Sequence, residues 1–487
     1  MKRMKRLGKK KMILPAILAI ILLAVALILI VNSTYTYDPI GSDNFLPEGQ
    51  SGVLTLRYNG ADGKPESEQI NYEKAQPVTL PTLSKKGYFF SGWLKGDLYV
   101  GNTITPLAKE ITLTARFDKD YTAITSPCAV YTNDGACLEY KVGNFASVAS
   151  KASDVYLDGG YKLTVYSKEN FEGKETKVYY SGKFSDDIGS MKVEAVKSDS
   201  VAVSALDDAT KLTLLKTFAP RIWWEEDEQY FASSVEFAAE NMDKVPGPYG
   251  NLYYMKELNS PRYTSEFFYG DLENAKAYAF AVEKEFKYLD LCYFYYAPFN
   301  LGKQIAGMEF GDHVGDWEHV SVRLLKETNG GKLTYRPVIV DYSAHFMCNY
   351  IAWDEVETID ETHPVAFTAR GSHGMWKDCG THIYVDAFVV QLKDYCSQGT
   401  AWDLWEEGKL ETYTYDALTH EGKGIGASEW KRDFDIDCGT EGGGVPFGSM
   451  LAGVRPFKST REWTLHRAAR STSRALTITT LSTGKLW

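Results

Sequence analysis

The chain has 487 residues, of which 44% are hydrophobic and 24% are charged, and its formal net charge is −11. This length is too great for a single core, so we expect several domains. The acidic balance argues against a nucleic-acid partner, because the phosphate backbone requires a basic protein face. The 32 Tyr, 23 Phe and 11 Trp residues favour sheet over helix.

The N-terminal end has two contrasting segments. Residues 1–11 are basic, and residues 12–31 form an uncharged apolar run. About 20 apolar residues span a hydrocarbon core, and the basic segment predicts a cytoplasmic N-terminus. We therefore expect a transmembrane anchor, which places the protein in the membrane as a single-pass chain with an extracytoplasmic body. The alternative is a signal peptide whose cleavage leaves the body secreted.

Residues 32–50 are polar with Gly and Pro, which is typical of a linker, and residues 51–118 alternate short apolar runs with turn signals. The motifs Gly87-Tyr88-x-Phe90-x-Gly92-Trp93 and Leu113-Thr-Ala-Arg-Phe117 resemble the B-repeat of internalin-type bacterial surface proteins. The resemblance implies a small β-grasp-like domain that serves as a spacer or adhesion module.

Residues 119–205 form a second predicted β domain. They resemble a βγ-crystallin Greek-key domain at four signature positions, Tyr166, Phe171, Gly173 and Ser190. Many domains of this family bind calcium through paired Asp or Asn residues and through carbonyl or hydroxyl oxygens of Ser. Here Ser185 occupies the first acidic position of that pattern, which argues against a calcium site.

Residues 206–457 contain the pattern His313-Val-Gly-Asp316-Trp-Glu318-His319. In a strand, Asp316 and Glu318 would share one face, and two such carboxylates repel each other unless a cation or protons lie between them. Gly315 permits a bend that brings His313 back toward the carboxylates. We therefore predict a divalent-cation site with His313, Asp316 and Glu318 as metal ligands. The mixed ligand set leaves Mg²⁺, Ca²⁺, Mn²⁺ and Zn²⁺ open.

Three further histidines lie in Gly- or Ser-flanked contexts typical of strand ends. His319, His345 and His373 are additional candidate site residues. The alternative interpretation is that the carboxylates face solvent and the histidines satisfy local hydrogen bonds. The seven cysteines include no CxxC pair, which argues against a thiolate zinc site.

The same segment carries two family resemblances. Residues 209–450 resemble the vacuolar protein sorting-associated protein 62 family through Phe218-Ala-Pro220, Phe299-Asn300, the His313 to His319 motif and Ala369-x-Gly371-Ser372-His373. More distantly, His313-x-x-Asp316-Trp-Glu318 resembles the core of necrosis- and ethylene-inducing-like proteins. That second resemblance implies a β-sandwich in which His313, Asp316 and Glu318 bind a divalent cation. Gly315 stands where that family has another His, so cytolytic activity is not carried over.

The predicted fold is therefore mainly β and multi-domain, with an N-terminal transmembrane helix, a small β-grasp-like repeat, a Greek-key β domain and a C-terminal β-sandwich. Residues 458–487 form a basic tail for which we expect disorder or one final strand. We expect a membrane-anchored bacterial cell-surface protein whose sandwich binds a cation and a lipid headgroup or glycan. The alternatives are a metal-dependent hydrolase and a purely structural or adhesion protein. No protease or esterase motif of the HExxH or GxSxG type is present.

Overall fold

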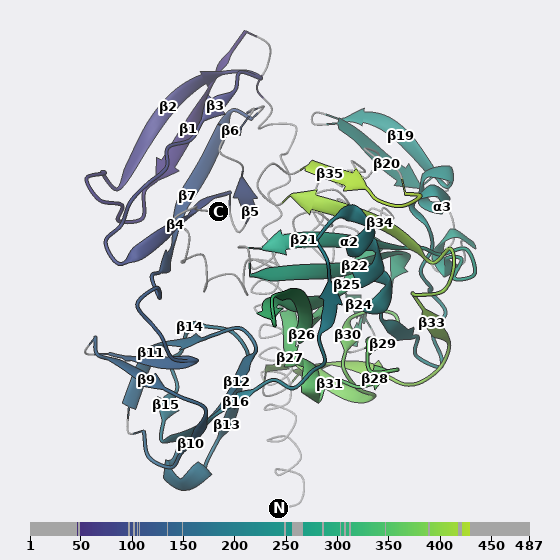
Figure 1. Ribbon diagram of the computed structural model, residues 1–487. Coiled ribbons are helices and arrows are strands. Elements are labelled where there is room, and N and C mark those ends of the chain that lie inside the picture. Colours follow the sequence, from purple (N-terminus) through teal and green to yellow (C-terminus); the bar gives the residue numbers. More distant parts are fainter. Residues whose placement is uncertain are drawn as a thin grey trace, which may run out of the picture.

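The structure is a computed structural model, and its chain is mainly β, as predicted. It describes residue 46 and residues 49–428, apart from 96–97, 101–102, 105, 107, 134, 149, 248–249, 256–265, 285–286, 302, 306–307, 311–312, 346, 388–389 and 417–420. Three β regions follow one another along the chain, shown in purple, blue and teal to yellow in Figure 1.

The first region is a sheet with the strand order β2-β1-β7-β4-β5. Its strands are β1 (Ser51–Arg57), β2 (Ser67–Glu73), β4 (Tyr88–Lys95), β5 (Leu98–Val100) and β7 (Glu110–Lys119), with a separate pair of β3 (Val78–Thr79) and β6 (Thr103–Ile104). The indole of Trp93 is buried in its core, and Nε1 donates a hydrogen bond to the Pro81 carbonyl at 2.9 Å. The aromatic residues of the predicted motif thus form the centre of this core.

The second region contains two small sheets around one core. One sheet consists of β10 (Gly143–Phe145), β16 (Ser190–Ala195), β12 (Tyr161–Tyr166) and β13 (Glu175–Val178). The other consists of β14 (Gly182–Lys183), β11 (Ser150–Leu157), β8 (Cys128–Thr132), β9 (Cys137–Tyr140) and β15 (Asp187–Ile188). A short 3-10 turn, η2 (Glu169–Phe171), is fixed by a hydrogen bond from Phe171 N to Ser190 Oγ at 2.8 Å.

The third region has a β-sandwich-like core between two sheets. The larger sheet consists of β17 (Val201–Val203), β26 (Lys332–Ala344), β25 (His313–Asn329), β22 (Tyr288–Asn300), β21 (Ala277–Lys284), β34 (Leu410–Asp416) and β35 (Glu421–Gly424), and β27 (Met347–Ala352) pairs with β26. The smaller sheet consists of β28 (Thr358–Ile359), β29 (His363–Thr368), β18 (Arg221–Trp223), β33 (Ala401–Asp403) and β30 (Met375–Trp376).

Strand β22 is the centre of this region because its apolar side chains are buried on both faces. Leu291 and Tyr293 pack toward the smaller sheet, while Phe294 and Tyr296 pack in a second, strongly aromatic core. A strand with no solvent-facing side lacks the polar alternation of a surface strand. Its near-continuous apolar sequence is therefore explained by burial on both sides.

The remaining described elements cover or extend the two sheets. They are α2 (Asp208–Thr217), α3 (Val235–Glu240), η3 (Glu266–Tyr269), η4 (Trp353–Glu355) and the hairpins β19 (Met242–Gly247) with β20 (Gly250–Met255), β23 (Lys303–Ile305) with β24 (Met308–Phe310), and β31 (Gly380–Ala387) with β32 (Val390–Cys396). Asp207 caps the N-terminus of helix α2, and its carboxylate accepts the Thr210 N–H at 2.8 Å.

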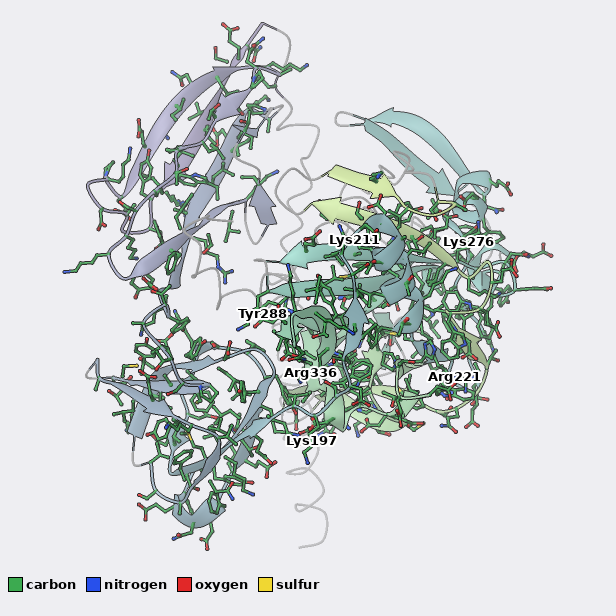
Figure 2. All side chains as sticks on the ribbon, in the orientation of Figure 1. Lys197, Lys211, Arg221, Lys276, Tyr288 and Arg336 are labelled. Atoms are coloured by element: carbon green, nitrogen blue, oxygen red, sulfur yellow. The ribbon has the colours of Figure 1, made fainter. Side chains whose placement is uncertain are left out.

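Polar contacts join the second region to the third. Arg336 donates from Nη1 to the Val196 carbonyl at 2.8 Å. Tyr288 contacts the second region so closely that a Cβ on Gly159 would lie 1.9 Å from its hydroxyl. Both Tyr288 and Arg336 lie on the side of the third region that faces the second (Figure 2).

The predicted single-pass membrane location is corrected. Within the described ranges, no helix has the length and apolar character needed to cross a membrane. The longest described helix, α2, has 10 residues, which corresponds to about 15 Å, half of a hydrocarbon core of about 30 Å. Residues 1–11, the predicted anchor at 12–31 and the tail at 458–487 lie outside the described residues.

Candidate functional site

The register of β22 and β25 places the predicted site residues on two different faces of the larger sheet. Glu318 lies opposite Tyr295, and His319 lies opposite Phe294. Successive side chains of a strand point to opposite faces, so Glu318 and Asp316 lie on the Tyr295 side. His319 lies on the other side, where its ring stacks on Phe294 with the centroids 4.8 Å apart.

The predicted bend before Asp316 is present. Gly315 has a φ of +73°, in the left-handed region that favours glycine. The strand pairing skips this residue, because Asp316 pairs with Ala297 and Val314 pairs with Phe299. His313 begins β25, opposite Asn300 in the pairing. Its side chain is outside the described part of the structure.

Three carboxylates converge on the Tyr295 side of the sheet. Asp316, Glu318 and Glu228 are 2%, 3% and 7% exposed. Burial raises the pKa of the Tyr295 hydroxyl well above its usual value, and the charges of Glu318, Asp316 and Glu228 raise it further. The three carboxylates therefore form one buried acidic cluster around this tyrosine, which we call the acidic cluster.

His373 is the basic partner of the acidic cluster. Its imidazole is fully buried, with Nδ1 3.4 Å from Oδ2 of Asp316 and Nε2 2.7 Å from the Tyr230 carbonyl oxygen. Burial alone would lower the pKa of His373, but the hydrogen bond to Asp316 and the charge of Glu228 outweigh it, so the pKa is raised. The geometry suits an imidazolium that donates from both nitrogens.

Both nitrogens of His373 are thus already engaged. A histidine binds a metal through an unprotonated nitrogen, and Nε2 must keep its proton to donate to the Tyr230 carbonyl. The structure therefore makes His373 a counter-charge for Asp316 rather than a ligand. Glu318 has a different partner, because its Oε2 accepts a hydrogen bond from the Ser343 hydroxyl.

His345 belongs to a neighbouring polar network around Asp394, whose side chain is fully buried. Asp394 accepts hydrogen bonds from Ser372 Oγ at 3.0 Å and Trp376 Nε1 at 3.0 Å, and its Oδ2 lies 2.8 Å from His345 Nε2. The ring of His345 also stacks on Tyr384 with the centroids 3.8 Å apart. This network positions the segment that carries His373, since Ser372 is the preceding residue.

His319 meets a separate group on the opposite face. Its Nε2 is 3.6 Å from Oδ2 of Asp341, and Cys348 completes the group. Ligand atoms of the three residues all lie within 4.8 Å of one another, and this is the one such group of three or more among the described side chains. The structure therefore pairs Asp316 with His373, keeps Glu318 on the same face of the sheet, and places His319 on the other face.

Sequence reasoning missed Glu228, Tyr230 and Asp394. Glu228 accepts backbone hydrogen bonds from Tyr230 at 2.8 Å and Gly371 at 2.6 Å, and so joins a distant loop to the His373 turn. No local sequence motif could reveal this contact, because Glu228 and Gly371 are 143 positions apart in the chain. One available signal was the acidic run that follows the tryptophans at 223–224.

Comparison with known proteins gives a family match within the third region. Residues 249–399 match the family model described as vacuolar protein sorting-associated protein 62. This range contains Asp316, Glu318, His319, His345 and His373.

Two curated relatives come from Saccharomyces cerevisiae. The chain is 31% identical over 171 residues to vacuolar protein sorting-associated protein 62, covering 32% of this chain and 34% of the relative. It is 32% identical over 165 residues to the putative vacuolar protein sorting-associated protein TDA6, covering 31% of this chain and 35% of the relative. The match thus spans about a third of each relative. Both names concern vacuolar sorting.

Among solved structures, "NLPPya in complex with glucosamine" is 13% identical and covers 45% of this chain and 79% of its own, with a TM-score of 0.24. "Crystal structure of N-terminal domain of protein S" is 19% identical and covers 14% of this chain and 94% of its own, with a TM-score of 0.13. The family match runs through the motifs around Phe299, Asp316 and His373. The predicted resemblance to the vacuolar protein sorting-associated protein 62 family is confirmed over residues 249–399.

Proposed function

We propose that the third region, residues 206–457, is a binding module that holds a divalent cation at Asp316 and Glu318. Through this cation it would bind an oxygen-rich surface ligand, either a lipid headgroup or a glycan. The predicted cation set of Mg²⁺, Ca²⁺, Mn²⁺ and Zn²⁺ narrows to the hard cations Mg²⁺, Ca²⁺ and Mn²⁺, because the acidic cluster offers carboxylate oxygens.

The observation that carries this proposal is the burial of three carboxylates with one imidazole. Asp316, Glu318 and Glu228 are all buried, and His373 supplies one positive charge next to Asp316. Buried like charges repel unless protons or a cation lie among them. Glu228 accepts backbone N–H groups from Tyr230 and Gly371, so we propose Asp316 and Glu318, on the same face of β25, as the ligands. His313 remains the predicted third ligand.

Aromatic side chains near the acidic cluster support the ligand class. Tyr269 is 41% exposed and its ring stacks on Tyr230 with the centroids 5.7 Å apart and the planes at 6°. The Tyr230 carbonyl in turn accepts the hydrogen bond from His373. An exposed aromatic face beside a polar site suits a sugar ring or a polar headgroup.

The first two regions are proposed as spacers. We infer that residues 51–118 are the β-grasp-like repeat and residues 119–205 the Greek-key domain that the sequence predicted. Each has its own apolar core, centred on Trp93 and on Leu163 respectively. A module with its own core is suited to hold the third region at a distance from another part of the chain.

A hydrolase is not favoured by the described geometry. A general base needs an unprotonated nitrogen within reach of a substrate or water. His373, one of the predicted candidates, is fully buried with both nitrogens engaged. The binding interpretation requires no such base.

The test is metal binding by the purified full chain. Calorimetric titration with Ca²⁺, Mg²⁺ and Mn²⁺ should show one bound cation in the wild type, and Asp316→Asn with Glu318→Gln should abolish it. The matched control is Glu357→Gln with Asp378→Asn, two carboxylates outside the acidic cluster, which should bind normally. Circular dichroism would establish that both double variants are folded.

Ligand binding is then measured with the same purified proteins. Vesicles with anionic headgroups and a glycan array should retain the wild type only when the cation is present. Full cation binding by the folded Asp316→Asn/Glu318→Gln variant would overturn the proposal, as would a wild type that binds none of the three cations.

A further inference from the structure

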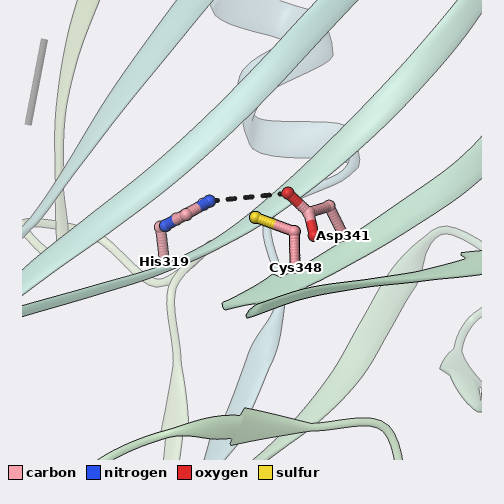
Figure 3. Close-up of side chains that lie close together, drawn as sticks. All are labelled: His319, Asp341 and Cys348. Atoms are coloured by element: carbon pink, nitrogen blue, oxygen red, sulfur yellow. Dashed lines mark ion pairs between the residues drawn. The ribbon is translucent and has the colours of Figure 1, made fainter. Parts of the chain in front are cut away.

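The opposite face of the larger sheet carries a second, chemically different group of ligands. His319, Asp341 and Cys348 come from three adjacent strands, β25, β26 and β27. Their side chains point toward one another, as Figure 3 shows. We call these three residues the mixed cluster.

The mixed cluster is compact and largely buried. One ligand atom of each residue lies within 4.8 Å of the other two, and Nε2 of His319 is 3.6 Å from Oδ2 of Asp341. The side chains of His319 and Asp341 are 1% and 5% exposed, while Cys348 is half-buried. Cys348 is therefore the most exposed of the three residues.

Asp341 has an unusual environment for a buried carboxylate. Neither of its oxygens accepts a hydrogen bond from a described residue, although the side chain is 5% exposed. Most buried carboxylates have hydrogen-bond partners or a cation, because an uncompensated buried charge is very unfavourable. A bound cation next to His319 and Asp341 would supply the compensating positive charge.

The neighbouring arginine already pairs with another carboxylate. Arg323 donates from Nε and Nη2 to the two oxygens of Asp290, each at 2.8 Å. Tyr350 is the other ionisable neighbour: burial, followed by the charges of Asp341 and Cys348, raises its pKa well above the usual value. A neutral Tyr350 contributes no positive charge to the mixed cluster.

The donor atoms decide which cation fits. An imidazole nitrogen, a carboxylate oxygen and a thiolate sulfur together match a borderline transition metal. Ca²⁺ and Mg²⁺ would need a shell of oxygens, which this trio does not provide. We propose that His319, Asp341 and Cys348 bind Zn²⁺ or a similar transition-metal ion, as a site separate from the acidic cluster.

The geometry requires only a small contraction. Ligand atoms around tetrahedral zinc lie roughly 3.5 Å apart, given bonds of about 2.0–2.3 Å, and the mixed cluster already holds its atoms within 4.8 Å. Three protein ligands leave a fourth position for water or another donor. Binding would release the Cys348 thiol proton, because the thiolate is the ligand. No CxxC motif is needed, since three strands supply the ligands.

Cobalt substitution tests this site directly. The full chain, stripped of metal and titrated with Co²⁺, should develop one equivalent of a thiolate-to-cobalt charge-transfer absorption, and Zn²⁺ should displace it. Cys348→Ser should remove the absorption and weaken Zn²⁺ binding. The loss of affinity should exceed the roughly 10–100-fold that is typical when a residue hydrogen-bonded to a metal ligand is removed. Cys379→Ser, which removes an exposed free thiol elsewhere, is the matched control and should leave both unchanged.

Two further measurements make the outcome decisive. Zn²⁺ should protect Cys348, but not Cys379, from alkylation by iodoacetamide, as mapped by mass spectrometry of the wild type. The double variant Asp316→Asn/Glu318→Gln should keep the cobalt absorption, which would show that the mixed cluster binds metal independently of the acidic cluster. Absence of a cobalt–thiolate band in the wild type, or a band that persists in Cys348→Ser, would overturn the proposal.

Discussion

Nδ1 of His373 lies 3.4 Å from Oδ2 of Asp316, and both side chains are at most 2% exposed. This pair joins the start of β25 to a turn 57 residues away. Because Nε2 of the same ring is held by the Tyr230 carbonyl at 2.7 Å, the pair fixes how Asp316 presents its carboxylate. The pair also gives the region a pH-dependent contact.

We expect His373→Gln to destabilise the protein more in mild acid than in base. The pKa of His373 is raised in the folded state, so its contribution is fully present below the unfolded value of about 6.5. It is lost as the pH rises through the folded pKa. Breaking a buried charged pair typically costs about 3–5 kcal/mol. Urea unfolding of wild type and variant from pH 5 to pH 9 measures the difference.

The control for that experiment is His382→Gln, because His382 contacts the carbonyl of the exposed Asp378 at 3.0 Å. It should change the free energy of unfolding little at any pH. A wild-type advantage over His373→Gln that grows with pH would contradict the assignment of an imidazolium.

Removing Arg323 alone should be more damaging than removing it together with Asp290. The two side chains are 8% and 4% exposed and form two hydrogen bonds. Arg323→Met leaves a buried carboxylate without its partner, which typically costs about 3–5 kcal/mol. Arg323→Met with Asp290→Leu replaces the whole pair by apolar groups and should recover much of that loss. Urea unfolding of the two single variants and the double variant measures the coupling.

The comparison pair for this cycle is Lys423–Asp208, whose side chains are 71% and 48% exposed. Lys423→Met should change stability by less than about 1 kcal/mol, as for other surface pairs. If Arg323→Met and the double variant lost the same free energy of unfolding, the charges of the buried pair would contribute nothing beyond the packing of the two side chains.

Acid should weaken the contact between the second and third regions through Glu355. Its Oε2 accepts hydrogen bonds from Lys177 Nζ at 2.7 Å and Tyr179 Oη at 2.9 Å. Burial alone would raise the pKa of Glu355, but the hydrogen bonds from Lys177, Tyr179 and Lys162 lower it. Its contribution is therefore present above the unfolded value of about 4.3 and is lost as the pH falls through the folded pKa.

Thermal unfolding between pH 6 and pH 3 checks this expectation. The wild type should lose more stability on acidification than Glu355→Gln, which has already lost the charge. Glu357→Gln, an exposed neighbour, should follow the wild-type curve. If the stability of the wild type and of Glu355→Gln fell in parallel as the pH decreased, Glu355 would not be the source of the acid sensitivity.

Gly159→Ala should disturb the same contact by a steric route. The added Cβ would lie 1.9 Å from the Tyr288 hydroxyl and 2.6 Å from its ring. Overpacking of this kind typically costs about 1–3 kcal/mol. In a Tyr288→Ala background the same change should cost much less, because the ring is gone. A double-mutant cycle of the unfolding free energy measures this coupling, and strict additivity would show that the two residues act independently.

Local sequence patterns anticipated the parts of the site that depend on neighbours in the chain. Asp316 and Glu318 were expected to share one face if they lay in a strand, and both lie in strand β25. Gly315 predicted a bend, and its φ is +73°. The grouping of His319 with the other candidates was a weaker inference. Alternation along a strand tells which of its side chains share a face, but not which residues of other strands those side chains will meet.

The sequence by itself determined that this chain is mainly β and that residues 249–399 carry motifs of the vacuolar protein sorting-associated protein 62 family. Only the tertiary structure decided which ionisable groups meet. It paired Asp316 with His373, brought Glu228 to the same cluster, and placed His319 with Asp341 and Cys348 on the other face. The reason is that these contacts depend on the pairing register of the strands and on loops that bring distant segments back to the sheet. Both involve residues far apart in the chain.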